Sequence, residues 1–109
     1  MGNAADLYKK LRTYMNFNEK DVVYKEIVVS DMTLMQLRDS LIGIGTILEE
    51  DLQEQVYVIS IMAGVANMNA AVIAVKLSQN VIKFAGYARE GLIKQHTVDK
   101  AIESIVASI

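Results

Sequence analysis

The chain of 109 residues contains no cysteine, no proline and no tryptophan, and it has a single histidine. Without cysteine there is no disulfide framework, no thiolate nucleophile and no cysteine-based zinc site. The absence of proline removes the strongest helix breaker and therefore favours helices. Aromatic residues are also few, at 6%, whereas hydrophobic residues make up 52% of the chain and include six methionines. We therefore expect an aliphatic and adaptable core.

The net charge of the chain is also small, at −2. Residues 1–55 carry six Lys and Arg against ten Asp and Glu, whereas residues 56–109 carry five against three. This split favours pairing between the two halves over binding to nucleic acid. The chain is long enough for one core and too short for two, so we expect a single domain over 1–109.

The most prominent feature that is present is an uncharged stretch at 55–75, which is rich in Val, Ile, Ala and Met. At a rise of ~1.5 Å per residue it would form a helix of roughly 30 Å. Since the chain beyond it also lacks proline, the sequence predicts one long apolar helix over 52–94, bent at Gly64 or Gly86.

Three further helices are predicted around this central one. One covers 3–15, a second begins at Ser30 or Asp31 and ends at 47 or 48, and the last begins after a cap at Thr97. The second has a heptad-like seam of apolar residues: Leu34, Leu37, Leu41, Ile44, Leu48. The last has an apolar inner face: Val98, Ala101, Ile102, Ile105, Val106. The fold class that we predict is an all-α bundle of about four helices.

The segment 22–29 is ambiguous. Its valines and isoleucine favour a strand, but Lys25 and Glu26 between two apolar triplets also fit two helical turns. A lone strand would have no partner in an all-helical chain. We therefore expect an extended segment or a short helix here, unless another copy of the chain pairs with it.

The predicted central helix is the basis for the function that we expect. No face of it is strongly polar, and the rest of the chain is too small to cover it. We therefore expect a cytoplasmic, non-enzymatic assembly or adaptor module, which self-associates or binds another helical protein by helix-in-groove packing. The expected interface is the small-residue faces of the helix: Ala63, Ala66, Asn67, Ala70, Ala74.

Two other function classes remain open. Residues 56–75 could cross a bilayer once, although Asn67 and Asn69 weaken a transmembrane span. Residues 88–105 loosely resemble a helix-turn-helix, which would make the protein a DNA-binding regulator. The start of the chain also resembles an N-myristoylation signal at Gly2, but Asp6 stands where Ser or Thr is favoured.

Residues for chemistry are few. His96 lies at a predicted helix boundary, which favours a capping role over catalysis. The acidic group at 49–54 is interpreted as a solvated corner between helices, because it lacks the spacing of a calcium loop. We expect no cofactor and no metal. Lys76, Lys83 and Lys94 would share one helical face, which could meet an anionic partner such as nucleic acid or lipid.

Overall fold

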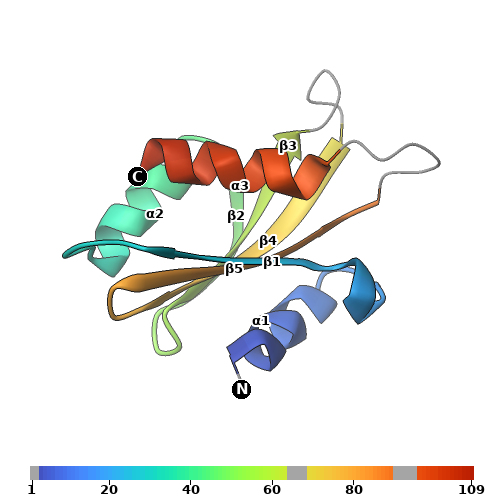
Figure 1. Cartoon of the computed structure of the whole chain (residues 1–109), viewed down its shortest axis with the longest axis horizontal. Coiled ribbons are helices and arrows are strands. Elements are labelled where there is room, and N and C mark those ends of the chain that lie inside the picture. The colour runs from blue at the N-terminus through green and yellow to red at the C-terminus, as the bar shows by residue number, and fades with distance from the viewer. Residues whose placement is uncertain (1–2, 64–68, 90–95) are drawn as a thin grey trace.

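In the part of the chain that the structure describes, five antiparallel strands form one sheet, and helices cover both of its faces (Figure 1). This computed structural model describes residues 3–63, 69–89 and 96–109. The elements in chain order are α1 (Asn3–Arg12), the short 3-10 helix η1 (Glu19–Asp21), β1 (Val23–Val28), α2 (Leu34–Ile42), β2 (Thr46–Asp51), β3 (Val56–Ala63), β4 (Asn69–Ser78), β5 (Val81–Ala88) and α3 (Thr97–Ser108).

The strand order across the sheet is β1-β5-β4-β3-β2. Strands β2 to β5 form a meander, and β1 returns to the far side, where it pairs with β5 from Val23 opposite Gly86 to Val28 opposite Val81. The turn between β4 and β5 has two residues, and Gln79 adopts a left-handed φ of 55° there. This order leaves β1 and β2 as the two edge strands.

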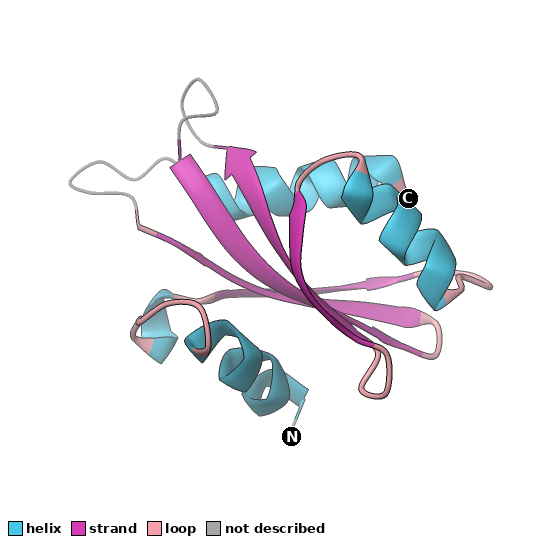
Figure 2. Cartoon of the chain, turned by 180° about the vertical axis from the view of Figure 1, so that it is seen from behind, coloured by secondary structure: helices cyan, strands magenta, loops and turns pink. Residues whose placement is uncertain are grey.

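Helices α2 and α3 pack on one face of the sheet, which we call the α2–α3 face (Figure 2). Alternate residues of the strands point to this face, as the two-residue period of a strand requires. Leu37 and Leu41 of α2 and Ile102 and Ile105 of α3 are buried against them. Helix α2 begins at a capping box, in which Thr33 and Gln36 bond to each other's backbone N–H groups.

Helix α1 packs on the opposite face, which we call the α1 face. Leu7 and Leu11 are fully buried there, over small or β-branched residues of the three central strands: Val56, Val58, Ala74, Ala85. The central strands are therefore covered on both sides. This explains why their sequence is an almost unbroken apolar run rather than an alternating one.

The prediction of an all-α bundle with a central helix over 52–94 is wrong. Strands β3, β4 and β5 lie within that range. A short apolar run does not distinguish a buried strand from a buried helix by periodicity, and here the β-branched Val and Ile residues fit the strand. The shortage of cover that the helix implied is also absent, because the central strands bury their two faces against different helices.

The remaining elements were predicted more closely. The first and last predicted helices correspond to α1 and α3, but α1 ends at Arg12 and α3 is preceded by His96 rather than by a capping Thr97. Of the predicted inner face of α3, Val106 is 40% exposed and the other four residues are buried. The second predicted helix is shorter than expected, because α2 ends at Ile42 and the residues from Thr46 onwards belong to β2.

The structure also places strands where the two alternative functions required helices. Residues 56–63 and 69–75 of the predicted membrane span lie in strands. Among the residues that the structure describes, none of the helices has the length and hydrophobicity needed to traverse a bilayer. The helix-turn-helix required a helix at Ala88, which is instead the last residue of β5, and α3 packs its apolar face on the sheet. Gly2 lies outside the described residues.

Candidate functional site

The small residues predicted as an interface do not form one surface. Ala63 is buried on the α2–α3 face, whereas Ala74 is buried under α1. Ala70 is exposed near the start of β4, where it pairs with the half-exposed Met62. Ala66 and Asn67 lie outside the described residues. Strands take the place of the helical face that was to bring these residues together, so its described members lie on different faces of the sheet.

Two of the three lysines predicted to share a face do lie side by side. Lys76 of β4 is directly opposite Lys83 of β5 on the α1 face, and Lys94 lies outside the described residues. Lys76 lies 3.9 Å from Glu54, and Lys83 is 9% exposed. A strand pairing rather than a helix brings the two lysines together, and an anionic partner for them stays a prediction.

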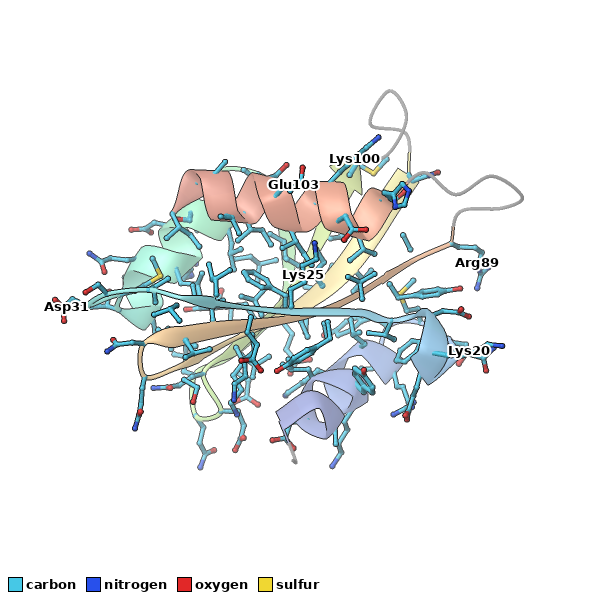
Figure 3. All side chains as sticks on the ribbon, viewed as in Figure 1. Lys20, Lys25, Asp31, Arg89, Lys100 and Glu103 are labelled. Atoms are coloured by element: carbon cyan, nitrogen blue, oxygen red, sulfur yellow. The ribbon has the colours of Figure 1, made fainter. Side chains whose placement is uncertain are left out.

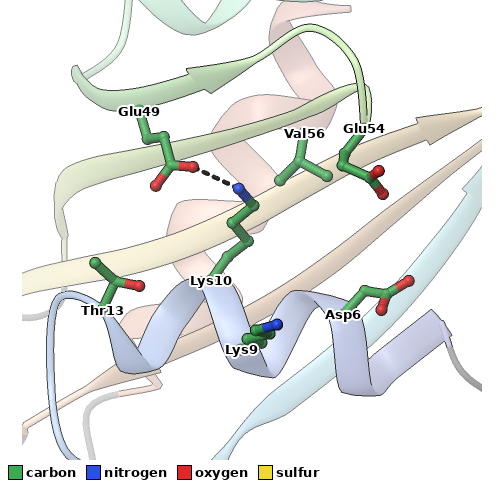
Figure 4. Close-up of a pocket in the computed structure, with 7 residues that line it drawn as sticks. All are labelled: Asp6, Lys9, Lys10, Thr13, Glu49, Glu54 and Val56. Atoms are coloured by element: carbon green, nitrogen blue, oxygen red, sulfur yellow. Dashed lines mark hydrogen bonds and ion pairs between the residues drawn. The ribbon is translucent and has the colours of Figure 1, made fainter.

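The acidic corner of the sequence forms a salt-bridge network with α1 (Figure 4). The Nζ atom of Lys10 lies 2.6 Å from Glu49 Oε2 and 2.7 Å from Asp51 Oδ2. The Lys10 ammonium holds the pKa of both carboxylates below the usual range, and the Tyr14 hydroxyl also donates to Glu49. These contacts fasten α1 to the edge strand β2.

A cleft of about 430 Å³ lies beside this network, between α1 and the turn that joins β2 to β3. It is lined by acidic and basic side chains in nearly equal number: Asp6, Lys9, Lys10, Thr13, Glu49, Glu54, Val56. Because the lysine between its carboxylates is already paired, the cleft has the character of an interface between two elements of one chain. The three acidic and two basic side chains nearly balance, so neither charge dominates the lining of the cleft.

The surroundings of His96 do not resemble a catalytic site. Its ring is largely exposed, and its Nδ1 atom lies 3.6 Å from Asp99 Oδ2, which is beyond hydrogen-bonding distance. The backbone of His96 is left-handed, with a φ of 55°, and its side chain makes no capping hydrogen bond to α3. Within the described part of the chain, no group of three His, Asp or Glu side chains is placed to hold a metal ion.

Among the described residues, the outer edge of β1 is the clearest binding feature that no other strand fills. The Val29 N–H donates to the Asn80 carbonyl oxygen at 2.7 Å. Because hydrogen-bonded residues alternate along an antiparallel pair, Val23, Lys25, Ile27 and Val29 point their main-chain groups at β5. The residues between them, Tyr24, Glu26 and Val28, therefore direct their N–H and C=O groups away from the sheet. Val28 is 83% exposed, more than any other large apolar side chain in the described residues.

The other edge strand is protected from pairing. Strand β2 contains a bulge, because its register with β3 shifts between Ile47 and Glu49. It then continues into three acidic residues, Glu49 to Asp51. Bulges and clustered charges are two ways in which proteins prevent an edge strand from pairing with another chain. Strand β1 has a regular register over its six residues and no bulge.

The charged side chains of β1 are held along the two faces of the sheet rather than over its edge. Lys25 points to the α2–α3 face, where its Nζ lies 2.9 Å from Asp99 Oδ1 of α3. On the α1 face the Tyr24 hydroxyl donates to Glu26 Oε2 at 2.6 Å. Burial, together with this carboxylate, raises the pKa of Tyr24 to about 12. Both charges are thus partnered, and the main-chain groups between them stay accessible.

No family model, no curated protein and no solved structure matches this chain. The function is therefore argued from its own residues. The sequence did contain the signal for the β1 edge, in the β-branched segment 22–29 and in the condition that another copy might pair with it. What the sequence could not supply was the neighbour on its other side, β5, because residues 81–88 fall within the predicted long helix.

Proposed function

We propose that this protein is a non-enzymatic assembly module that works by strand addition at the outer edge of β1. One observation carries the proposal: among the described residues, Tyr24, Glu26 and Val28, which alternate along β1, present main-chain groups that no other strand pairs with. The side chain of Val28 beside them is exposed to water. In strand addition the main-chain hydrogen bonds provide affinity, and alternate side chains provide selectivity. We further propose that the protein acts in the cytoplasm, which fractionation of the native cells tests.

The contrast between the two edges supports this proposal. If the protein had only to avoid aggregation, both edges would benefit from the same protection. Strand β2 has a bulge and three acidic residues, whereas β1 is regular and carries Val28 in the open. An exposed Val that becomes buried on binding contributes roughly 1.5–3 kcal/mol. The unprotected edge is therefore the one where a partner gains most by pairing.

Titration of the isotopically labelled chain with a short β-forming peptide tests the proposal. The probe is a capped heptapeptide of alternating Thr and Val, which has no charge and can pair only as a strand. In NMR spectra we expect shift changes concentrated on the amides of residues 22–30. Chemical shifts that change instead on α2 or α3, or that do not change at millimolar peptide, contradict strand addition at β1.

A matched pair of variants isolates the main-chain contribution. Glu26→Pro removes an N–H group that points away from the sheet, so the fold keeps its ladder to β5, as proline on an edge strand allows. Glu26→Thr removes the same carboxylate and keeps the N–H group. We expect the Thr variant to bind the peptide and the Pro variant to lose binding at least tenfold. Equal binding by the two variants refutes a main-chain mode.

A further inference from the structure

The residues of β1 and its flanks have nearly the same chemical order in both directions. Two aliphatic residues, Val22 and Val23, precede Tyr24, and the mirror positions beyond Lys25 hold Glu26 and then the aliphatic Ile27 and Val28. Two copies related by a two-fold axis pair their edge strands antiparallel, so each strand meets its own reverse. A segment with this mirrored order is complementary to itself.

The structure allows few registers for such a pair. Residues opposite each other must share a face of the sheet, and Tyr24, Glu26 and Val28 must meet one another to use their outward main-chain groups. An axis at Glu26 places two carboxylates opposite each other. An axis at Ile27 places Lys25 opposite Val29. Only the axis at Lys25 matches aliphatic with aliphatic residues and Tyr24 with Glu26.

Within β1, this register creates one contact between like charges, which lies between Lys25 and its copy at the axis. Directly opposed like charges destabilise a strand pair. Each Lys25, however, already lies 2.9 Å from its own Asp99, so each ammonium has its counter-charge on α3. The contact at the axis is therefore between two salt bridges rather than between two free cations.

Lys20 and Asp31 lie at opposite ends of the β1 edge (Figure 3). Lys20 lies just before β1 and Asp31 lies just after it, and both are exposed. Neither forms an ion pair with another residue in the described part of the chain. An axis at Lys25 brings the Lys20 end of one copy to the Asp31 end of the other. Glu19 and Asp21 lie beside Lys20 in η1, and Glu19 pairs with Arg12, so Lys20 is the cation of η1 that can meet Asp31 of the other copy.

We propose that the strand added at β1 is β1 of a second copy of this chain. The two five-stranded sheets then join into one continuous sheet, with a two-fold axis through Lys25. This inference rests on the proposed function and names its partner. Because a single strand edge is a small interface, we expect a dissociation constant on the order of micromolar or weaker. The protein therefore exchanges between one and two copies as its concentration changes.

Cysteine crosslinking tests the register, because the native chain has no cysteine to interfere. In the proposed dimer the two Lys25 Cα atoms form a pair without main-chain hydrogen bonds, about 4.5 Å apart, within reach of a disulfide. Under mild oxidation we expect Lys25→Cys to give a covalent dimer on a non-reducing gel. Circular dichroism of the reduced variant verifies that it is folded.

Two control cysteines occupy other exposed positions. Glu26→Cys lies on the same strand, but its copy is displaced by two residues in this register and so lies beyond disulfide distance. Glu50→Cys lies on the protected edge β2. We expect both to crosslink at least tenfold more slowly than Lys25→Cys. Equal rates for the three variants, or no crosslink at residue 25, overturn the two-fold pairing.

The peptide titration separates this failure from failure of the proposed function. If Lys25→Cys does not crosslink and the Thr-Val peptide still shifts the β1 amides, the partner is not a second copy and strand addition stands. If neither occurs, β1 is not a binding edge.

The end charges give an independent test in the unmodified strand. Lys20→Glu makes all three charges of η1 negative, so it removes the attraction to Asp31 and adds repulsion at both ends of the dimer, since the axis repeats the pair. We expect it to raise the dissociation constant about 2- to 30-fold at low salt, with a smaller effect at high salt. Lys100→Glu on α3 changes the net charge equally and serves as the control. A similar effect of both substitutions refutes the proposed contact.

Discussion

Replacement of Ala74 by leucine should destabilise the protein, whereas the same replacement at Ala70 should not. Both residues lie on the α1 face of β4. Ala74 is fully buried between Val58 and Ala85 on the neighbouring strands, with Leu7 of α1 packed in the same cluster. Ala70 is exposed beyond the cover of α1.

The size of the effect depends on this difference in cover. The three extra carbons at Ala74 have no free space, so the strand and α1 must separate or side chains must leave their rotamers, at a cost of about 1–3 kcal/mol. For a domain of this size that corresponds to a fall in Tm of roughly 4–15 °C. At Ala70 the added side chain extends into water, and we expect a change within about 0.5 kcal/mol.

Urea unfolding followed by circular dichroism measures both variants against the parent chain. Residues four apart share a face in a helix as well as in a strand, so a helix over this region would give similar costs at the two positions. Equal destabilisation, or a larger loss for Ala70→Leu, would show that α1 does not cover β4 as described. An unchanged m-value indicates that the difference lies in stability rather than in the unfolded state.

Two further predictions concern the contacts that hold the helices on the sheet. Lys10→Met should cost about 1–3 kcal/mol at neutral pH. The lowered pKa values of Glu49 and Asp51 mean that this stabilisation is present above their unfolded pKa of about 4 and lost as pH falls below it. Urea midpoints of the two proteins should therefore converge in acid, and a constant gap from pH 7 to 2 would contradict the network. On α3, Ile105→Ala should cost about 2–5 kcal/mol because the side chain is fully buried. Val106→Ala should cost less than about 1 kcal/mol, since that side chain is 40% exposed, and the reverse order in thermal melts would show that α3 is rotated.

The amphipathic helices could be predicted from the sequence because one face of each meets the sheet and the other meets water. This holds for α1 and α3, whose apolar spacing of three and four residues gave their existence and approximate bounds. It also holds in part for α2, where Leu37 and Leu41 are buried as the seam indicated. Gly45, which follows α2, lies close to the backbone of β3. A Cβ at Gly45 would lie 2.5 Å from the Ser60 carbonyl oxygen, so this position requires glycine.

The central strands could not be predicted by the same reasoning. When both faces of a strand are buried, the alternation that marks a strand disappears. In β3 and β4 the stripes of Val, Ile and Ala consequently resemble the faces of one helix. The content of β-branched residues is the better guide there, as it is in β1.

The predicted helix over 52–94 is the reason why the open edge of β1 could not be predicted from the sequence. The sequence indicated that 22–29 could be a strand, but a strand needs a neighbour, and the neighbour was hidden in the predicted helix. Once β5 is recognised, β1 has one paired side and one open side. The lysine pair is a different case, since Lys76 and Lys83 meet across two strands, and no spacing along the chain encodes that register.

Sedimentation equilibrium over a wide range of concentration tests the central claim most directly. We predict that the average mass rises with concentration from 12.1 kDa, the mass of one copy, towards twice that value. We also predict that Glu26→Pro stays at 12.1 kDa throughout, while Glu26→Thr behaves like the parent chain. A parent chain that keeps the mass of one copy at millimolar concentration, or a proline variant that associates equally well, would contradict the claim that the edge of β1 is where this protein assembles.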